Sequence, residues 1–117
     1  MPVEKWSENV AIVHLADDPQ LTDDLRALEQ MLGLAHGQGG TPVHSVLDFA
    51  AVTYINSSNI AKLLRLRKHM ITNDARLVLC GVNTQVWSAF LVTGLDKVFE
   101  VSDNVATGLA TLQIAQV

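Results

Sequence analysis

The chain has 117 residues, of which 49% are apolar and 17% charged, and its formal net charge is −4 at pH 7. That length suits one domain with a substantial core, and the composition excludes a disordered chain and a coiled coil. The negative charge argues against nucleic-acid binding, and no apolar run approaches the ~20 residues that cross a bilayer. A single cysteine, Cys80, and an N-terminus without the charged and apolar regions of a signal peptide favour a reducing cytoplasm of the bacterial type.

The charges divide unevenly along the chain. Residues 1–50 carry eight acids against two bases, a balance of −6, whereas residues 51–117 carry six bases against four acids, a balance of +2. Four of those bases lie close together, at Lys62, Arg65, Arg67 and Lys68. They form either a solvated helix face or a docking surface, and the sequence alone leaves both interpretations open.

The first half of the chain is predicted to contain three strands and one helix. Residues 3–6 and 10–16 are predicted to form a β-hairpin that turns near residues 7–9. Thr22 then caps a helix whose leucines recur at helical spacing, and the glycine-rich stretch 37–40 ends it. Residues 43–49 form a buried strand.

The second half is predicted to alternate helix and strand. Its elements are the helix 57–71, the apolar strand 77–82, a helix that Thr84 caps, the short strand 98–101 and a helix that Asp103 caps. Gly94 supplies a left-handed residue just past the third helix, and Leu95 can fold back as the apolar partner of a Schellman cap. The order predicts a single α/β domain, with four helices and a mixed, mostly parallel sheet of four to five strands.

The most informative stretch is 47–64, which reads as an apolar strand, a short loop and two serines that open an amphipathic helix. A helix N-terminus presents unpaired amide donors and the positive end of the helix dipole. A hydroxyl there can cap the helix, and the same place favours a phosphate. Ser57 and Ser58 are therefore candidates for either role.

Three blocks in this order resemble one known family. Residues 48–64, 76–82 and 93–99 are similar to the STAS domain, the module shared by sulfate transporters and bacterial anti-sigma factor antagonists. The family pattern is an apolar strand ending in Asp, an Asp-Ser-Ser-Gly type motif opening a helix, a strand of the Leu-Val-Leu type, and a helix closing on Thr-Gly-Leu-Asp. The resemblance runs from about residue 10 to the C-terminus, so residues 1–117 are expected to be one STAS domain.

The resemblance implies a phospho-regulated binding module in the cytoplasm, without catalysis, cofactor or metal of its own. Such a protein binds an anti-sigma factor that is also a serine kinase of the histidine-kinase-like ATPase type, and phosphorylation of the helix-opening serine releases it. A PP2C-type phosphatase resets the switch. Carried onto this chain, the phosphorylated residue is Ser57, with Ser58 as the second candidate. Nucleic acid and membrane are not expected as partners, and self-association into a homodimer stays open.

The expected contact surface comprises the loop before the two serines, the start of the helix and one helix face. Its residues are Thr53, Tyr54, Asn56, Ser57, Ser58, Asn59, Lys62, Arg65 and His69. The last three recur at i, i+3 and i+7, which places them on one side of a helix.

Two positions depart from the family pattern. Asn56 replaces the Asp before the serines, which keeps a good helix cap but removes a negative charge that a kinase could read. Asn59 replaces the Gly after them, so a side chain is expected where the family leaves room for a partner's backbone. These departures support a second hypothesis, a STAS scaffold or ligand-sensing module that is not phosphorylated.

A third hypothesis is a receiver-like domain that accepts phosphate at Asp48. Asp17 and Asp18 follow one predicted strand and Asp48 ends another, as the Mg²⁺-binding and phospho-accepting acids of receivers do. The intervening chain holds one predicted helix where a receiver has helix, strand and helix. Asp48 is expected instead to orient the loop 53–56.

Overall fold

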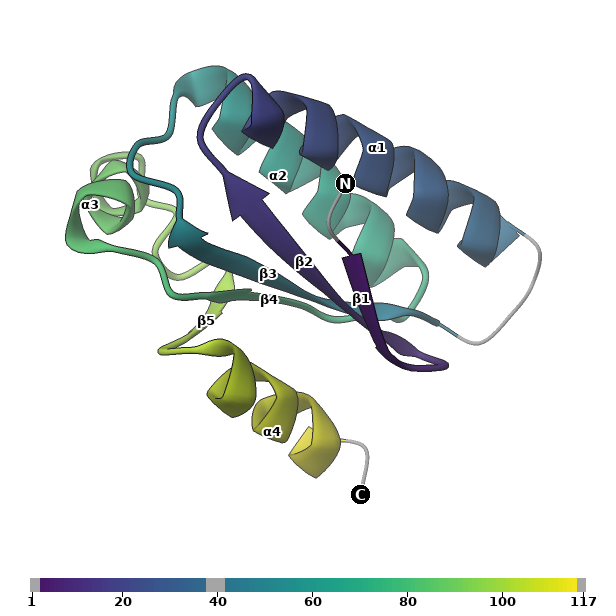
Figure 1. The fold of residues 1–117 in the computed structure, drawn as a ribbon. Helices are drawn as coiled ribbons and strands as arrows, with labels where there is room; N and C mark the ends of the chain where they lie inside the picture. The colour runs from purple at the N-terminus through teal and green to yellow at the C-terminus, as the bar shows by residue number, and fades with distance from the viewer. Residues whose placement is uncertain (1–2, 38–41, 116–117) are drawn as a thin grey trace.

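The computed structural model describes residues 3–37 and 42–115 and shows nine elements in the predicted order (Figure 1). The strands are β1 (Val3–Ser7), β2 (Val10–Ala16), β3 (His44–Ala51), β4 (Leu77–Cys80) and β5 (Glu100–Ser102). The helices are α1 (Gln20–Gly37), α2 (Ser57–Thr72), α3 (Thr84–Val92) and α4 (Val105–Ala115). Residues 38–40 of the glycine-rich stretch that was predicted to end α1 lie outside the described part of the chain.

The five strands form one sheet in the order β1-β2-β3-β4-β5. β1 runs antiparallel to β2, and the other three pairings are parallel, which confirms the predicted mixed, mostly parallel sheet. Receiver domains have the order 2-1-3-4-5. The receiver-like hypothesis is therefore wrong, because β1 here pairs at the edge as a hairpin and no crossover places a strand beyond it.

The sheet separates two apolar clusters. The larger joins alternate residues of the sheet to α1, α2 and α3, and the smaller joins the opposite face to α4 (Figure 1). The close approach of α4 depends on Gly108, since a Cβ at that position would lie 2.6 Å from the Cys80 Sγ. Burial raises the pKa of the Cys80 thiol to about 11, so this cysteine is an inert core residue. None of the described helices is both long and apolar enough to cross a membrane.

Asparagine residues cap α3 and α4, in place of the residues predicted to do so. Asn83, not Thr84, is the N-cap of α3, and its side chain accepts the N–H of Val86 at 2.8 Å. Asn104, not Asp103, accepts the N–H of Thr107 at 2.9 Å in the first turn of α4. An Asn side chain one residue ahead of each helix competes for the same amide and ranks among the best caps.

The Schellman cap of α3 is confirmed. Gly94 has φ +73°, the N–H of Leu95 donates to the carbonyl of Phe90 at 2.8 Å, and the N–H of Gly94 donates to that of Leu91 at 3.2 Å. This bond pattern ends α3 and turns the chain toward β5. The strand β5 starts at Glu100, later than the predicted 98–101, because the N–H of Val98 is used in a turn with the carbonyl of Leu95.

Candidate partner-binding and phosphorylation site

The N-cap of α2 is Asn56. Its Oδ1 accepts the N–H of Asn59 at 2.8 Å, and the Oδ1 of Asn59 accepts the N–H of Asn56 at 3.0 Å. This is a reciprocal capping box, which satisfies two amides near the start of the helix. The capping role that the sequence left open for Ser57 and Ser58 therefore belongs to Asn56.

The two serines differ in what their hydroxyls do. Ser57 is the first residue of α2 and is exposed, and no hydrogen bond within the described residues engages its hydroxyl. The Ser58 hydroxyl accepts a hydrogen bond from Lys62 Nζ at 3.0 Å. The first turn of α2 contains no acidic residue of its own, and the acid that lies against the start of the helix is Asp18, from outside it. Ser57 is thus the serine whose hydroxyl is open to modification.

Asn59 is fully buried and joins α2 to α1. Its Nδ2 donates to Asp18 Oδ2 at 3.2 Å and to Thr22 Oγ1 at 3.3 Å. The expectation that this side chain stands between the domain and a partner is wrong, since the capping box and the neighbouring helix turn it into the domain. Asn59 at this position therefore adds hydrogen bonds within the domain and does not obstruct a partner.

Asp17 fixes the loop that leads to the serines. Its Oδ1 accepts the N–H of Thr53 at 2.8 Å, and its Oδ2 accepts the Thr53 hydroxyl at 2.6 Å. These bonds from Thr53 hold the pKa of Asp17 below the usual 3.8, because they stabilise the charged carboxylate. The loop therefore has a defined geometry ahead of α2.

Asp18 connects the starts of two helices. Its Oδ1 accepts the N–H and the hydroxyl of Thr22, at 2.8 and 2.6 Å, and its Oδ2 accepts from Asn56 Nδ2 at 3.3 Å and Asn59 Nδ2 at 3.2 Å. Hydrogen bonds led by the Thr22 hydroxyl hold the pKa of Asp18 below its usual value. The predicted cap by Thr22 is wrong, because α1 begins at Gln20 and Thr22 serves as a donor to Asp18. We call Asp17 and Asp18 the aspartate clamp.

Asp48 does not orient the serine loop, contrary to expectation. Its Oδ2 lies 2.8 Å from His14 Nδ1, and its Oδ1 accepts the N–H of Ala50 at 3.0 Å. Residues two apart on a strand share a face, so Asp48 points to the same face as Val46, which packs under α4. The serine loop and α2 lie on the other face of the sheet. The loop 53–56, which Asp48 was expected to orient, is instead held by the aspartate clamp.

A largely apolar hollow of about 330 Å³ lies beside Ser57, between the start of α2 and α3. Ile55 and Ile60 line one side of it, and Ala89 and Val92 line the other. Val92 is 87% exposed, and the neighbouring Leu91 is 52% exposed. Exposed apolar side chains gathered beside a polar rim are typical of a protein-contact surface.

The helix α3 was not among the elements expected at the contact surface. The available signal was that α3 carries apolar residues on both sides, since Val86 and Phe90 fill the core while Leu91 and Val92 remain outside. A nine-residue helix with more apolar residues than one face can bury indicates a second contact. Tyr54, which was assigned to the site, is also exposed, at 46%.

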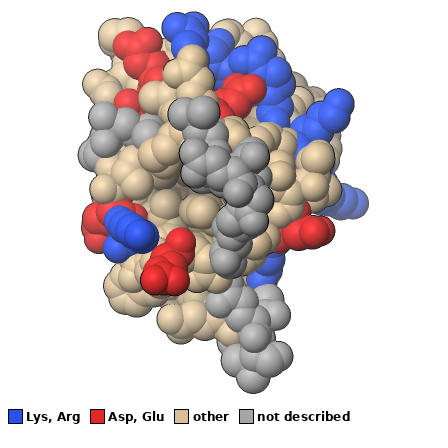
Figure 2. All heavy atoms as spheres, turned by 90° about the vertical axis from the view of Figure 1, so that its right-hand side faces the viewer, with Lys and Arg blue, Asp and Glu red and all other residues tan. Residues whose placement is uncertain are grey.

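The predicted cationic stripe of α2 lies apart from this hollow. Lys62 bonds to Ser58, and Arg65 forms an ion pair with Glu29 of α1 at 3.5 Å. His69 and Arg65 line a groove between α1 and α2, whereas Ser57 and its hollow face α3. In Figure 2 the lysine and arginine side chains gather along the upper part of the molecule, where Figure 1 places α1 and α2. The structure thus divides the expected surface into an apolar part beside Ser57 and a cationic part beside α1.

The two carboxylates of the aspartate clamp receive hydrogen bonds from neighbouring residues. Among residues 3–37 and 42–115, no group of three or more His, Cys, Asp or Glu side chains is arranged to hold a metal ion. Asp17 and Asp18 are engaged by hydroxyl and amide donors instead. The site thus combines an exposed hydroxyl at a helix N-terminus, an apolar hollow and a loop held by hydrogen bonds, and its exposed apolar side chains are typical of a surface that contacts another protein.

Several solved structures share the fold of this chain. The fold is similar to an anti-sigma-factor antagonist (STAS) domain protein from Planctomyces limnophilus, with a TM-score of 0.79, 18% identity, and coverage of 96% of this chain and 97% of that one. The anti-sigma factor antagonist SpoIIAA in its unphosphorylated form gives 0.76 and 13%, covering 96% and 95%. A chain of the stressosome, described as a signal integration and transduction hub, gives 0.75 and 20%, covering 98% of both. The family model of the STAS domain matches residues 5–108, and the chain therefore belongs to the STAS domain family.

Proposed function

We propose that this protein is an anti-sigma factor antagonist controlled by phosphorylation of Ser57. In the unphosphorylated form it binds an anti-sigma factor that is also a serine kinase of the histidine-kinase-like ATPase type. Phosphorylation by that kinase ends the complex, and a PP2C-type phosphatase restores the binding form. The protein acts in the cytoplasm and has no catalytic role of its own.

The observation that carries the proposal is the state of the Ser57 hydroxyl. It lies exposed at the first position of α2 without a hydrogen bond to the described residues, because Asn56 supplies the cap. Ser58 is less accessible to a kinase, since Lys62 Nζ bonds its hydroxyl. The similarity to SpoIIAA and to the protein from Planctomyces limnophilus supports the class of function.

The geometry around Ser57 explains how phosphorylation would release a bound partner. A phosphate on Ser57 adds about −1.5 to −2 charges beside the hollow that Ile60 and Val92 line. An apolar partner surface seated there would have to desolvate that charge, which opposes binding. The helix dipole and the first amides of α2 stabilise the same charge within the domain. Phosphorylation is therefore expected to remove the partner while leaving the fold intact.

The first test is the intact mass of the protein purified from its own host, with and without phosphatase treatment, followed by peptide mapping. A phosphatase-sensitive gain of one phosphate on Ser57 is the expected result in at least one growth condition. A protein that stays unmodified in both growing and stressed cells would overturn the proposed switch. A phosphate found on Ser58 alone would overturn the assignment to Ser57.

A second candidate function is a STAS scaffold within a larger signalling assembly. It is favoured by the similarity to the stressosome chain, and by the loss of the acidic residue at position 56. This candidate predicts an unmodified Ser57 together with a high molecular mass in light-scattering measurements at cellular concentration. A phosphorylated protein that remains monomeric would exclude it.

A further inference from the structure

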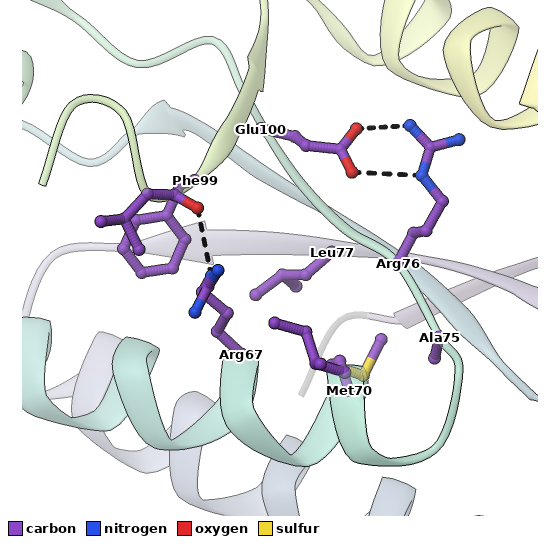
Figure 3. Close-up of a pocket in the computed structure, with 9 residues that line it drawn as sticks. Arg67, Met70, Ala75, Arg76, Leu77, Phe99 and Glu100 are labelled. Carbon is purple, nitrogen blue, oxygen red and sulfur yellow. Dashed lines mark hydrogen bonds and ion pairs between the residues drawn. The ribbon is translucent and has the colours of Figure 1, made fainter.

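A second cavity lies at the other end of α2, remote from Ser57. It has a volume of about 230 Å³ and lies between the last turns of α2, the start of β4 and the segment that leads into β5 (Figure 3). Met70, Leu77 and Phe99 form its apolar part, and each of them is buried in the core. Three charged residues, Arg67, Arg76 and Glu100, line the rest of the cavity, and its volume suits a ligand smaller than a drug-sized molecule.

Arg67 supplies an unneutralised charge to this cavity. Its Nε donates to the carbonyl of Val98 at 3.1 Å, which fixes the guanidinium over the cavity beside Phe99 (Figure 3). Among the described residues, Arg67 takes part in none of the ion pairs, and its terminal amino groups make no hydrogen bond. The guanidinium is therefore oriented but retains donors for an external acceptor.

The other charges at the cavity neutralise each other. Arg76 binds Glu100 through two parallel hydrogen bonds, from Nε to Oε1 and from Nη2 to Oε2 (Figure 3). The Arg76 Nη1 also reaches the carbonyl of Thr111 at 3.4 Å. Glu100 is thus committed to Arg76, and the cavity carries one uncompensated positive charge, on Arg67.

We propose that this cavity binds a small organic carboxylate with an apolar body. The carboxylate would accept hydrogen bonds from the terminal amino groups of Arg67, a planar donor that suits two-point binding of carboxylates. The apolar body would lie against Ile71 and Val98, which line the same cavity and keep exposed surface that the ligand would remove from water. Neither half suffices alone, because one exposed ion pair contributes little and the apolar area is small.

The proposed site is independent of the proposed switch. Thirteen residues separate Ser57 from Met70, which at 1.5 Å per residue places them about 20 Å apart along α2. A ligand at Arg67 therefore leaves the hollow beside Ser57 open. Failure of one proposal leaves the other untouched, since the two tests use different residues and different readouts.

The test is an NMR titration of the ¹⁵N-labelled protein with benzoate as the probe. The amides of residues 67–77 and 98–100 are expected to shift and saturate, with a dissociation constant of about 1 mM or below. Benzyl alcohol, which keeps the ring and lacks the charge, and acetate, which keeps the charge and lacks the ring, should each bind at least about tenfold more weakly.

Two variants separate a specific site from general anion binding. Arg67→Gln should weaken benzoate binding at least about tenfold, and Arg67→Lys should retain part of it because the charge remains. Arg65→Gln removes the same charge from the same helix at a position outside the cavity, and it should bind as the wild type does. Equal losses in Arg65→Gln and Arg67→Gln, equal binding of benzyl alcohol, or no saturable shift up to about 20 mM benzoate would each overturn the proposal.

Discussion

Asp17 holds Thr53 through both of its carboxylate oxygens, at 2.8 Å to the amide nitrogen and 2.6 Å to the hydroxyl. The two residues are 36 positions apart in sequence, and the contact fixes the loop that precedes Ser57. Asp18, the next residue, holds Asn56 and Asn59 at the start of α2. The loop before Ser57 and the start of α2 are therefore held in place by two residues of the turn that follows β2.

Replacing Asp17 by Asn is expected to loosen the serine loop without unfolding the domain. The amide and hydroxyl of Thr53 lose a charged acceptor, so the Thr53 amide should exchange with solvent faster in hydrogen-exchange measurements. Asp103→Asn, an exposed acid before α4, is the matched control and should leave that exchange unchanged.

The stability of the contact between Asp17 and Thr53 is expected to depend on pH. Because the pKa of Asp17 lies below its usual 3.8 in the folded protein, the contact contributes stability above pH 3.8 and loses it as the pH falls through the lowered pKa. The Thr53 amide resonance should follow that titration in the wild type and not in Asp17→Asn. An amide that titrates identically in both proteins would contradict the assignment of this contact.

Asn59→Gly restores the residue of the family pattern and is expected to destabilise this chain. The change removes the capping box and leaves Asp18 and Thr22 without their common donor. Lost hydrogen bonds to a charged group and the glycine penalty within a helix together predict a loss of about 2–3 kcal/mol of unfolding free energy, measured by urea denaturation. Ser58→Gly, the exposed neighbour, should lose no more than about 1 kcal/mol. Equal losses in the two variants would show that Asn59 adds nothing beyond its backbone.

The histidine on β2 is predicted to stabilise the β1 edge below neutral pH. His14 Nε2 lies 2.7 Å from Glu4 Oε1, and its Nδ1 lies 2.8 Å from Asp48 Oδ2, and hydrogen bonds led by Glu4 raise the pKa of His14 above 6.5. The resulting stability is fully present below pH 6.5 and is lost as the pH rises through the raised pKa. An NMR titration of the ring should show this elevated pKa, and Glu4→Gln should lower it more than Asp48→Asn does.

The pKa of His44 is shifted in the direction opposite to that of His14, so the two rings can be compared in one titration. Burial lowers the pKa of His44 below 6.5, with a further contribution from Arg76. Its neutral ring accepts the N–H of Arg76 at 2.9 Å, so this contact is lost as the pH falls through the lowered pKa. Titration of both rings above 6.5, or of both below it, would contradict the structural assignment.

Val92→Asp is expected to impair partner binding with little effect on stability. The side chain is almost fully exposed, so the unfolding free energy should change by no more than about 0.5 kcal/mol. A carboxylate at the edge of the hollow beside Ser57 should reduce the amount of the anti-sigma factor captured from host lysate by at least about tenfold. Ala110→Asp, an equal change on the exposed side of α4, should capture as the wild type does. Unchanged capture by Val92→Asp would remove α3 from the contact surface.

Ser57→Asp and Ser57→Ala should separate the charge of the phosphate from loss of the hydroxyl. Ser57→Asp is expected to weaken capture of the same partner, whereas Ser57→Ala should bind constitutively and acquire no phosphate. A charge at the first position of α2 should leave the unfolding free energy equal or raise it by about 0.3–1 kcal/mol. Equal binding by both variants and the wild type would exclude the switch at Ser57, and Ser58→Ala is the control that should still switch.

Local sequence patterns were enough to predict the order of the nine elements, the α/β class and the helix that begins at Ser57. These follow from apolar periodicity and from local signals, such as Gly94 and Leu95 at the end of α3. The caps at Asn83 and Asn104 were within reach of the same local rules, and were missed because neighbouring Thr and Asp residues cap nearly as well.

Which distant residues meet at the site depends on how the strands and helices pack, and local patterns do not predict it. The pairing of β2 with β3 brings Asp17 to Thr53 and Asp18 to Asn59, whereas the alternation of side chains along β3 turns Asp48 to the other face. The start of α2 faces α3 while its cationic side faces α1, which separates Ser57 from the cations that share its helix. Local sequence encodes the period within an element, but contacts between elements depend on sheet register and helix packing, which arise only when the whole chain folds.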